Sequence, residues 1–314
     1  MRNAYVFTAT AIFLILGVKL DAVPAPASQS PLIPPSLGVC PSPMAQSASR
    51  VYEVGARVRV LLFWTGLHDE GRARIAWSSS ADGTRRTELL IGTDPDLAFR
   101  RLNRWGYISE TTCEAGAEIV GLMTAADEAS IEEAQARLDS TGVGASMYRA
   151  IRTRIANHTA TADVLRLSTS ETFTFRDASA LFARLPASGA LRHLSVPTDA
   201  EPGLLAATSH LIALATTEAA RSPRRLSHAR RRYVYAATTY ELVLASSTIR
   251  REVAIGSARY GPALDAAFTI LNLSTGETTE FALTAGTIGD LAGVPLRIVY
   301  RPRWWLELEL TLTA

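Results

Sequence analysis

The feature that most constrains the fold is a long alternation at the C-terminal end, from Leu296 to Leu312. Every second residue there is apolar or proline, and most positions between are charged. Successive side chains of a β-strand point to opposite faces, so the pattern predicts a strand with one buried face. A single strand of this length would span about 55 Å, about three times the usual length. We therefore expect strong coiling or a break at Pro302, because proline lacks the N–H that a sheet ladder needs.

Strand patterns also dominate the rest of the chain after residue 50. Apolar residues alternate in Val51–Trp64 and again in Gly71–Trp77, and we expect Thr65–Gly71 to form the hairpin turn between them. Turn-forming residues or breaks in the alternation predict further turns at 82–83, 236–239 and 274–276.

Helical spacing occurs in three segments, at 127–138, 177–185 and 203–219. The last is apolar on almost all sides, so we expect it to be buried on most of them. Long one-sided antiparallel strands around an apolar helix predict a mainly β fold with a minor α component. The expected architecture is a curled antiparallel sheet, a half-barrel or β-clam, that encloses one or more helices. The sequence leaves open whether the 203–219 helix fills the cavity or leaves it accessible.

The N-terminal end has the pattern of an export signal. Arg2, the apolar run Tyr5–Val18 and the A-x-A site at Ala25–Ala27 predict a signal peptide over 1–27 and a secreted or periplasmic protein. A retained membrane anchor is the alternative. A Pro- and Ser-rich linker is predicted over 28–50, followed by a single β-rich domain over 51–314.

The chain has two cysteines, Cys40 and Cys113. In an oxidising compartment they would pair as a disulfide. Two structural thiols are equally compatible with the sequence.

Charge excludes some partners and suggests another. The net charge of +2 gives no general attraction to nucleic acid. An arginine-rich segment follows the apolar helix and suggests a peripheral contact with anionic lipid, or else a solvated connector. Its residues are Arg221, Arg224, Arg225, Arg230, Arg231 and Arg232.

Aromatic rings beside arginines are the candidate ligand-binding residues. One group is Trp105 and Tyr107, and the other is Arg301, Arg303 and Trp305. Such rings stack on sugars or lie at a membrane interface. The alternative is that the first group belongs to a packed strand and that arginine stems shield Trp305.

Catalytic and metal-binding patterns are not found in the sequence. The five histidines have no metal-ligand spacing, and neither an H-E-x-x-H nor a G-x-S-x-G motif occurs. His68–Glu70 is expected on a solvated hairpin tip, and Glu307 and Glu309 are expected as exposed charge. We therefore predict no catalytic residue, metal or cofactor, and an enzyme is disfavoured.

The segments "YEV", "YVYAATTYEL" and "AGVPLRIVYRPRWW" resemble secreted or periplasmic β-clam proteins that have no assigned activity and are similar in shape to the lipoprotein-carrier fold. The resemblance covers Val51–Gly92 and Tyr233–Leu312. It implies a cavity able to take an acyl chain. The predicted function is a non-enzymatic β-clam that binds an apolar ligand or handles envelope lipid or lipoprotein. The alternatives are a structural or interaction protein with a filled core, and a hydrolase or carbohydrate-active enzyme with a dispersed site.

Overall fold

The structure is a computed structural model. It describes residues 40, 46–60, 63–93, 105–124, 146–169, 190–221, 228–303 and 306–313. The predicted signal peptide, most of the predicted linker, and the predicted helices at 127–138 and 177–185 lie outside the described residues.

The described chain is built almost entirely from strands. The first half of the sheet consists of β1 (Gln46–Val60), β2 (Phe63–Ser79), β3 (Arg85–Thr93), β4 (Trp105–Cys113), β5 (Gly116–Thr124), β6 (Ser146–Ala156), β7 (Thr159–Thr169) and β8 (Ala190–Ser195). The second half consists of β9 (Ala200–Glu201), β10 (Ala229–Tyr235), β11 (Thr238–Arg250), β14 (Ala263–Asn272), β15 (Thr278–Gly286), β16 (Pro295–Arg303) and β17 (Leu306–Leu312). The helix α3 (Leu204–Arg221) lies between β9 and β10 in sequence, β12 (Val253–Ile255) and β13 (Ala258–Tyr260) form a separate hairpin, and η4 (Gly289–Leu291) is a 3-10 turn.

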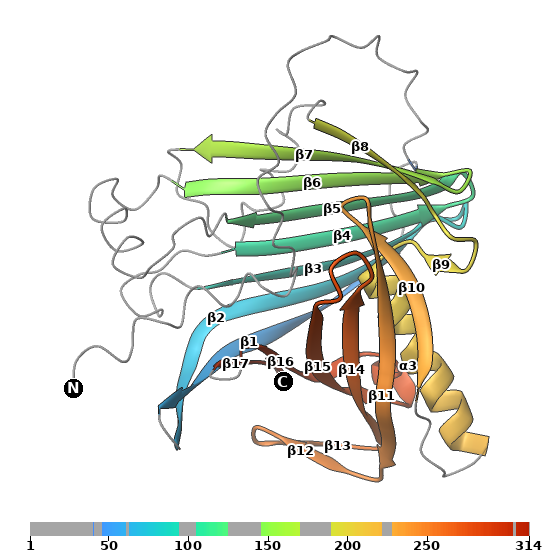
Figure 1. Cartoon of the computed structure of the whole chain (residues 1–314). Coiled ribbons are helices and arrows are strands. Elements are labelled where there is room, and N and C mark those ends of the chain that lie inside the picture. The colour runs from blue at the N-terminus through green and yellow to red at the C-terminus, as the bar shows by residue number, and fades with distance from the viewer. Residues whose placement is uncertain are drawn as a thin grey trace.

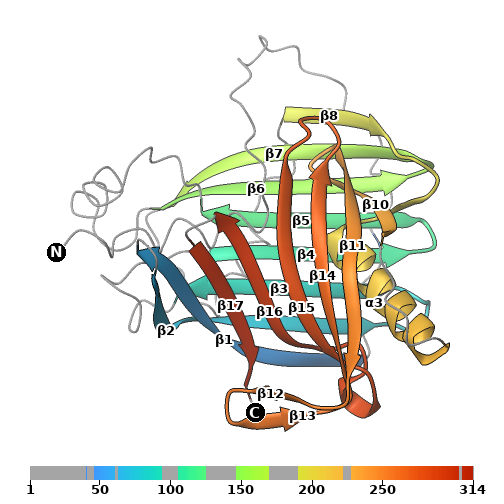
Figure 2. The ribbon, with the colours of Figure 1, turned by 60° about the horizontal axis from the view of Figure 1, so that its bottom comes forward.

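The fifteen strands of the main sheet follow the order β8-β7-β6-β5-β4-β3-β2-β1-β17-β16-β15-β14-β11-β10-β9. Neighbouring strands are antiparallel apart from β9 and β10, which run parallel. The sheet curls so that its two halves face each other with their strands crossing at a steep angle (Figures 1 and 2). The prediction of a mainly β, curled half-barrel with a helix is confirmed.

The two ends of the curled sheet come together beside β10. Val234 of β10 is fully buried against Ala160 of β7 and Val196, which follows β8. The N–H of Val196 also donates to the carbonyl of His158, at the β6–β7 turn, at 2.8 Å. Apolar contact therefore closes part of the gap between the sheet edges, which gives the fold a barrel-like shape.

The predicted tight turns are confirmed. Ala236 and Ala237 connect β10 and β11 with φ of 53° and 55°, the left-handed conformation of a two-residue hairpin turn. At the β2–β3 turn, the N–H of Thr84 donates to the Asp82 carboxylate at 2.9 Å, and Gly83 takes a positive φ.

The C-terminal alternation forms a hairpin and not one strand. Tyr300 of β16 pairs with Leu308 of β17, and Arg303 pairs with Leu306. The register shifts between these two pairs, at Pro302. Without that shift, a two-residue turn would place odd positions of β16 opposite even positions of β17. The shift brings the apolar sets of both strands to one face, which explains why the sequence alternates without a break.

The first hairpin also differs from the prediction. β1 ends at Val60 and β2 begins at Phe63, so the segment predicted as the turn belongs to β2. Val54 and Ala56 of β1 pair with Gly71 and Leu67 of β2, so residues 68–70 form a bulge in a continuous strand. β1 also pairs with β2 from Gln46 onward, so the strand includes the last residues of the predicted linker.

Candidate ligand cavity between the halves of the sheet

The helix α3 packs against the second half of the sheet, mainly β10, β11 and β14 (Figures 1 and 2). Ala207, Leu211 and Ala215 of α3 are fully buried, and the two alanines allow the helix close to the strands. On its other side, Ser209 and Ala213 are exposed. The helix therefore has one exposed side, and it covers one side of the curled sheet without occupying the centre.

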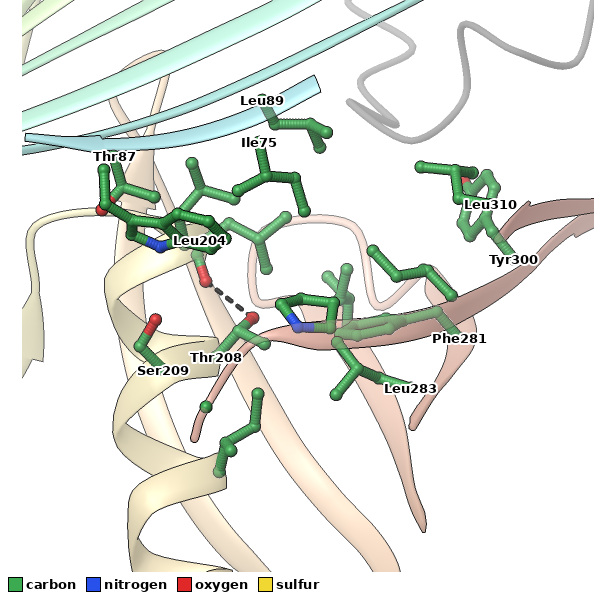
Figure 3. Close-up of a pocket in the computed structure, with 17 residues that line it drawn as sticks. Ile75, Thr87, Leu89, Leu204, Thr208, Ser209, Phe281, Leu283, Tyr300 and Leu310 are labelled. Atoms are coloured by element: carbon green, nitrogen blue, oxygen red, sulfur yellow. Dashed lines mark hydrogen bonds between the residues drawn. The ribbon is translucent and has the colours of Figure 1, made fainter. Parts of the chain in front are cut away.

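A cavity of about 110 Å³ lies where α3 and the two halves of the sheet meet. In the close-up, Ile75 and Leu89 of the first half project towards Phe281 and Leu283 of the second half (Figure 3). The described residues of the lining are Ile75, Trp77, Thr87 and Leu89; Leu204, Leu205, Thr208, Ser209 and Ile212 of α3; and Ile270, Phe281, Leu283, Gly293, Pro295, Ile298, Tyr300 and Leu310.

The lining is almost entirely apolar. It includes no Asp, Glu, His, Lys, Arg or Cys among the described residues. Thr208, one of its few hydroxyl-bearing residues, donates a hydrogen bond to the Leu204 carbonyl of its own helix at 2.8 Å (Figure 3). Because this hydroxyl already has a partner, the wall near it offers mainly carbon to an occupant.

The cavity lies between two clusters of buried side chains. Ile75 and Leu310 belong to one cluster, and Ile212 and Leu283 belong to the other. Leu89, Phe281 and Ile298 pack against both clusters and are only partly buried. These bridging side chains also line the cavity, which therefore lies where the two clusters meet.

A buried carboxylate from the first half holds the beginning of α3. Glu110 of β4 is only 3% exposed. Its two oxygens accept hydrogen bonds from the N–H groups of Leu205 at 2.7 Å and Ala206 at 2.8 Å. These N–H groups have no partner within the helix, so Glu110 acts as an N-terminal cap supplied from a distant strand.

Burial raises the pKa of Glu110 to about 7. The two N–H donors of α3 lower that pKa, and the nearby Glu201 carboxylate raises it. Gly203 allows this close approach, because a Cβ at that position would lie 2.3 Å from the Glu110 carboxyl group. Glu110 was not predicted from the sequence, although a glutamate at an inward position of an otherwise packed strand is a signal that could have identified it.

Of the aromatic and arginine residues predicted to bind a ligand, Tyr107 and Arg301 have described side chains, and neither is among the described residues that line this cavity. Tyr107 lies on the opposite face of β4 from Glu110, where its buried hydroxyl donates to Glu88 at 2.5 Å and burial raises its pKa. Arg301 is exposed on β16 and pairs with Glu307 at 2.7 Å. Trp105 and Arg303 are described only as terminal strand residues, and Trp305 lies outside the described residues.

Glu307 was predicted to be exposed charge, and this was wrong. It is 2% exposed, because Arg57 of β1 and Arg301 of β16 approach its carboxylate from both sides at 3.1 and 2.7 Å. Glu309 is partly buried and accepts a hydrogen bond from Arg297 at 2.6 Å. His68–Glu70, predicted on a hairpin tip, lie within β2.

The described arginines after α3 have acidic neighbours. Arg230 lies 3.2 Å from Glu241, and Arg231 lies 4.0 Å from Glu201. Arg232 lies 3.7 Å from Asp199. Arg221 ends α3, and Arg224 and Arg225 lie outside the described residues. The β10 part of this segment therefore carries paired charges.

Cys40 and Cys113 form a disulfide with a Cα–Cα distance of 5.8 Å, which is the first of the two alternatives left open by the sequence. The bond joins the chain ahead of β1 to the end of β4.

Within the described residues, no cluster of three or more His, Cys, Asp or Glu side chains is arranged to hold a metal ion. The described part of the chain also contains no helix with the length and apolar character needed to cross a membrane.

Comparison with known proteins assigns no family to this chain. No family model matches the chain, and no curated protein matches it significantly. A solved structure with a similar arrangement is the β-barrel-like protein of domain of unknown function DUF1849 from Brucella abortus. It is 9% identical, with 84% of this chain and 94% of that chain covered and a TM-score of 0.44.

Proposed function

We propose that this protein is a secreted or periplasmic β-clam that holds an apolar ligand in the cavity between the halves of its sheet. The observation that carries the proposal is the cavity itself, which is lined by carbon from both halves and from α3. Burial of apolar surface is the driving force that such a wall offers a ligand.

The size of the cavity limits what it can hold. Its 110 Å³ is close to that of an engineered protein cavity of about 150 Å³ that binds benzene or xenon. It is smaller than the roughly 300–1,000 Å³ typical of sites for drug-sized molecules. The occupant is therefore a small apolar molecule or the apolar part of a larger one, such as the acyl chain of an envelope lipid or lipoprotein.

Two observations support the proposal that the protein is secreted or periplasmic. The first 27 residues have the pattern of a secretory signal peptide. The Cys40–Cys113 disulfide is a bond that persists in oxidising compartments such as the periplasm. The paired charges of Arg230, Arg231 and Arg232 give little support to a membrane contact through β10.

The alternatives have less support. A core filled by the helix fits poorly, because α3 forms one wall of the cavity and leaves space beside it. A hydrolase needs a nucleophile or an acid–base pair at its site. The described lining offers no carboxylate, imidazole or thiol for this role.

A matched pair of substitutions on β14 tests the proposal. Ile270 lines the cavity, and its neighbour Leu271 points to the opposite face of the strand. The neutral probe N-phenyl-1-naphthylamine carries a phenyl ring, which is the size of group that a cavity of this volume holds. Ile270→Trp should fill the space and weaken binding of this probe by at least about tenfold, since about 1.4 kcal/mol of lost contact already has that effect. Leu271→Trp should leave binding unchanged.

Probe fluorescence, titrated into the purified full chain, measures both affinities. Circular dichroism of each variant shows whether the sheet is intact. The proposal fails if the wild-type protein does not bind the probe, or if both tryptophan variants bind it as the wild type does.

A further inference from the structure

The attachment of α3 to the two halves of the sheet is unequal. Its buried face, built on Ala207, Leu211 and Ala215, packs on the strands of the second half. A second contact to that half lies on its outer side. Arg231 of β10 donates to Nε2 of His210 at 2.7 Å, and Nδ1 of His210 donates to Glu201 of β9 at 2.7 Å. The helix and the second half are therefore held together as one body.

The first half reaches the helix through a different kind of contact. Glu110 of β4 accepts the N–H groups of Leu205 and Ala206 at the first turn of α3. Leu204 and Leu205, in the same turn, line the cavity opposite Ile75 and Leu89 of the first half. The first turn of α3 therefore both donates the hydrogen bonds to Glu110 and forms part of the cavity wall.

We propose that Glu110 is a latch across the cavity, and that breaking its two bonds to α3 lets the second half and α3 move away from the first half and admit the ligand. The inference rests on the proposed function, because it assigns the regulation of the same cavity. At the cavity wall beside the first turn of α3, the other contacts to the first half are made by apolar side chains, which can separate without leaving an unpaired buried charge. The β1–β17 ladder keeps the two halves joined at the other side of the cavity.

The chemistry of a buried carboxylate makes the latch sensitive to pH. In the closed state the pKa of Glu110 is about 7, and exposure to water on opening returns it towards 4.5. The closed state therefore binds the proton more tightly than the open state. Closure is most favoured below about pH 4.5 and weakens as the pH rises through 7.

Other titratable groups face Glu110 and have to be separated from it. Glu201 of β9 raises its pKa, and Tyr233 of β10 lies close enough to interact with it. Thr87 of β3 and Ile119 of β5, its cross-strand partners, carry no charge. His210 is linked to Glu201, so a variant at His210 is required as a control.

Spin-label distances between the two bodies test the latch without any ligand. Arg85→Cys on β3 and Ala213→Cys on α3 introduce labels at exposed positions of the first half and of the helix. The native cysteines are joined in a disulfide and do not react with the label. We expect one distance distribution at pH 5 and an added longer component at pH 8.

Variants identify the group responsible. Glu110→Gln should abolish the response to pH. Glu88 is a carboxylate on the face of β3 that points away from the cavity, and Glu88→Gln should retain the response. His210→Gln should also retain it. If Glu110→Gln does not fold, Gly203→Ala serves instead, because its methyl group displaces the carboxylate and should produce the longer component already at pH 5. A wild-type distribution that is the same at both pH values overturns the proposal, and so does a pH response that survives Glu110→Gln.

Probe kinetics connect the latch to the cavity. In the wild type, dissociation of N-phenyl-1-naphthylamine should be about tenfold faster at pH 8 than at pH 5, which is within the limit set by the shift of the Glu110 pKa. In Glu110→Gln, the dissociation rate should be equal at both pH values. A distance response without probe binding would contradict the proposed function and leave the latch standing. Probe binding without a pH response would contradict the latch alone.

Discussion

One tyrosine of the second half reaches the backbone of the first half. Tyr235 of β10 is 4% exposed, and its hydroxyl lies beside Gly121 of β5. A Cβ at position 121 would stand 2.1 Å from that hydroxyl oxygen, far inside contact distance. Position 121 therefore requires glycine because the Tyr235 hydroxyl from the other half leaves no room for a Cβ atom. The strand conformation of residue 121 does not by itself require glycine.

This contact predicts the cost of a single methyl group. Gly121→Ala should destabilise the protein by about 1–3 kcal/mol, the usual range for overpacking a tight interior. Tyr235→Phe, which removes the nearest atom, should recover part of that loss in the double variant. Urea unfolding of the single and double variants measures the coupling. Equal stability of Gly121→Ala and wild type would show that the two halves are not in contact here.

At the residue scale, the sequence predicted buried apolar side chains well and buried polar ones poorly. The alternation placed Leu308 and Leu310 in the core, where they lie. It also placed Glu307 on a solvated face. That residue is buried because strands that are distant in sequence bring Arg57 and Arg301 to it. Periodicity describes which face a side chain takes, and it carries no information about what covers that face.

At the element scale, Glu307 joins three neighbouring strands. Its carboxylate on β17 lies between Arg57 of β1, the first strand of the chain, and Arg301 of β16. The cluster lies where the first half of the sheet meets the second, in the β1–β17 ladder. A charge removed here leaves two arginines without their common partner.

Glu307→Ala should therefore destabilise the protein by about 2–3 kcal/mol, less than a fully buried pair because both arginines keep contact with water. Glu252→Ala is the matched control, since Glu252 pairs with Arg259 and both are exposed. Its expected effect is below about 1 kcal/mol. Thermal unfolding of both variants makes the comparison, and effects of equal size would contradict a structural role for Glu307.

The turns of the second half were predictable at this scale because local chemistry determines them. The change of parity near Ala236 and the Ser274–Gly276 sequence each mark a reversal that the structure contains. The irregularity at Pro302 was one of the two outcomes expected from the sequence. The reversal between Arg303 and Leu306 was not predicted, because the register shift at Pro302 restores the alternation that a two-residue turn would interrupt. The bulge of β2 led to the opposite error. Residues 68–70 have the sequence of a hairpin tip, so a turn was predicted where the strand in fact continues.

At the scale of the whole molecule, one-sided strands and an apolar helix were sufficient to predict a curled sheet. They were not sufficient to place the cavity. Its wall combines β2 and β3 with β14–β17 and α3, which come together only because the halves of the sheet cross. The helix also takes its position from Glu110, which lies 95 residues before its partner Leu205 in the chain. Contacts of such separation are not encoded in local periodicity.

The central claim is that an apolar, accessible cavity lies between the halves of the sheet. Crystals of the full chain pressurised with xenon test it most directly, because apolar protein cavities of this size bind xenon. We expect an anomalous peak within van der Waals distance of Leu89, Leu204 and Phe281. Absence of xenon at that position, with side chains or ordered water filling the space, would contradict it.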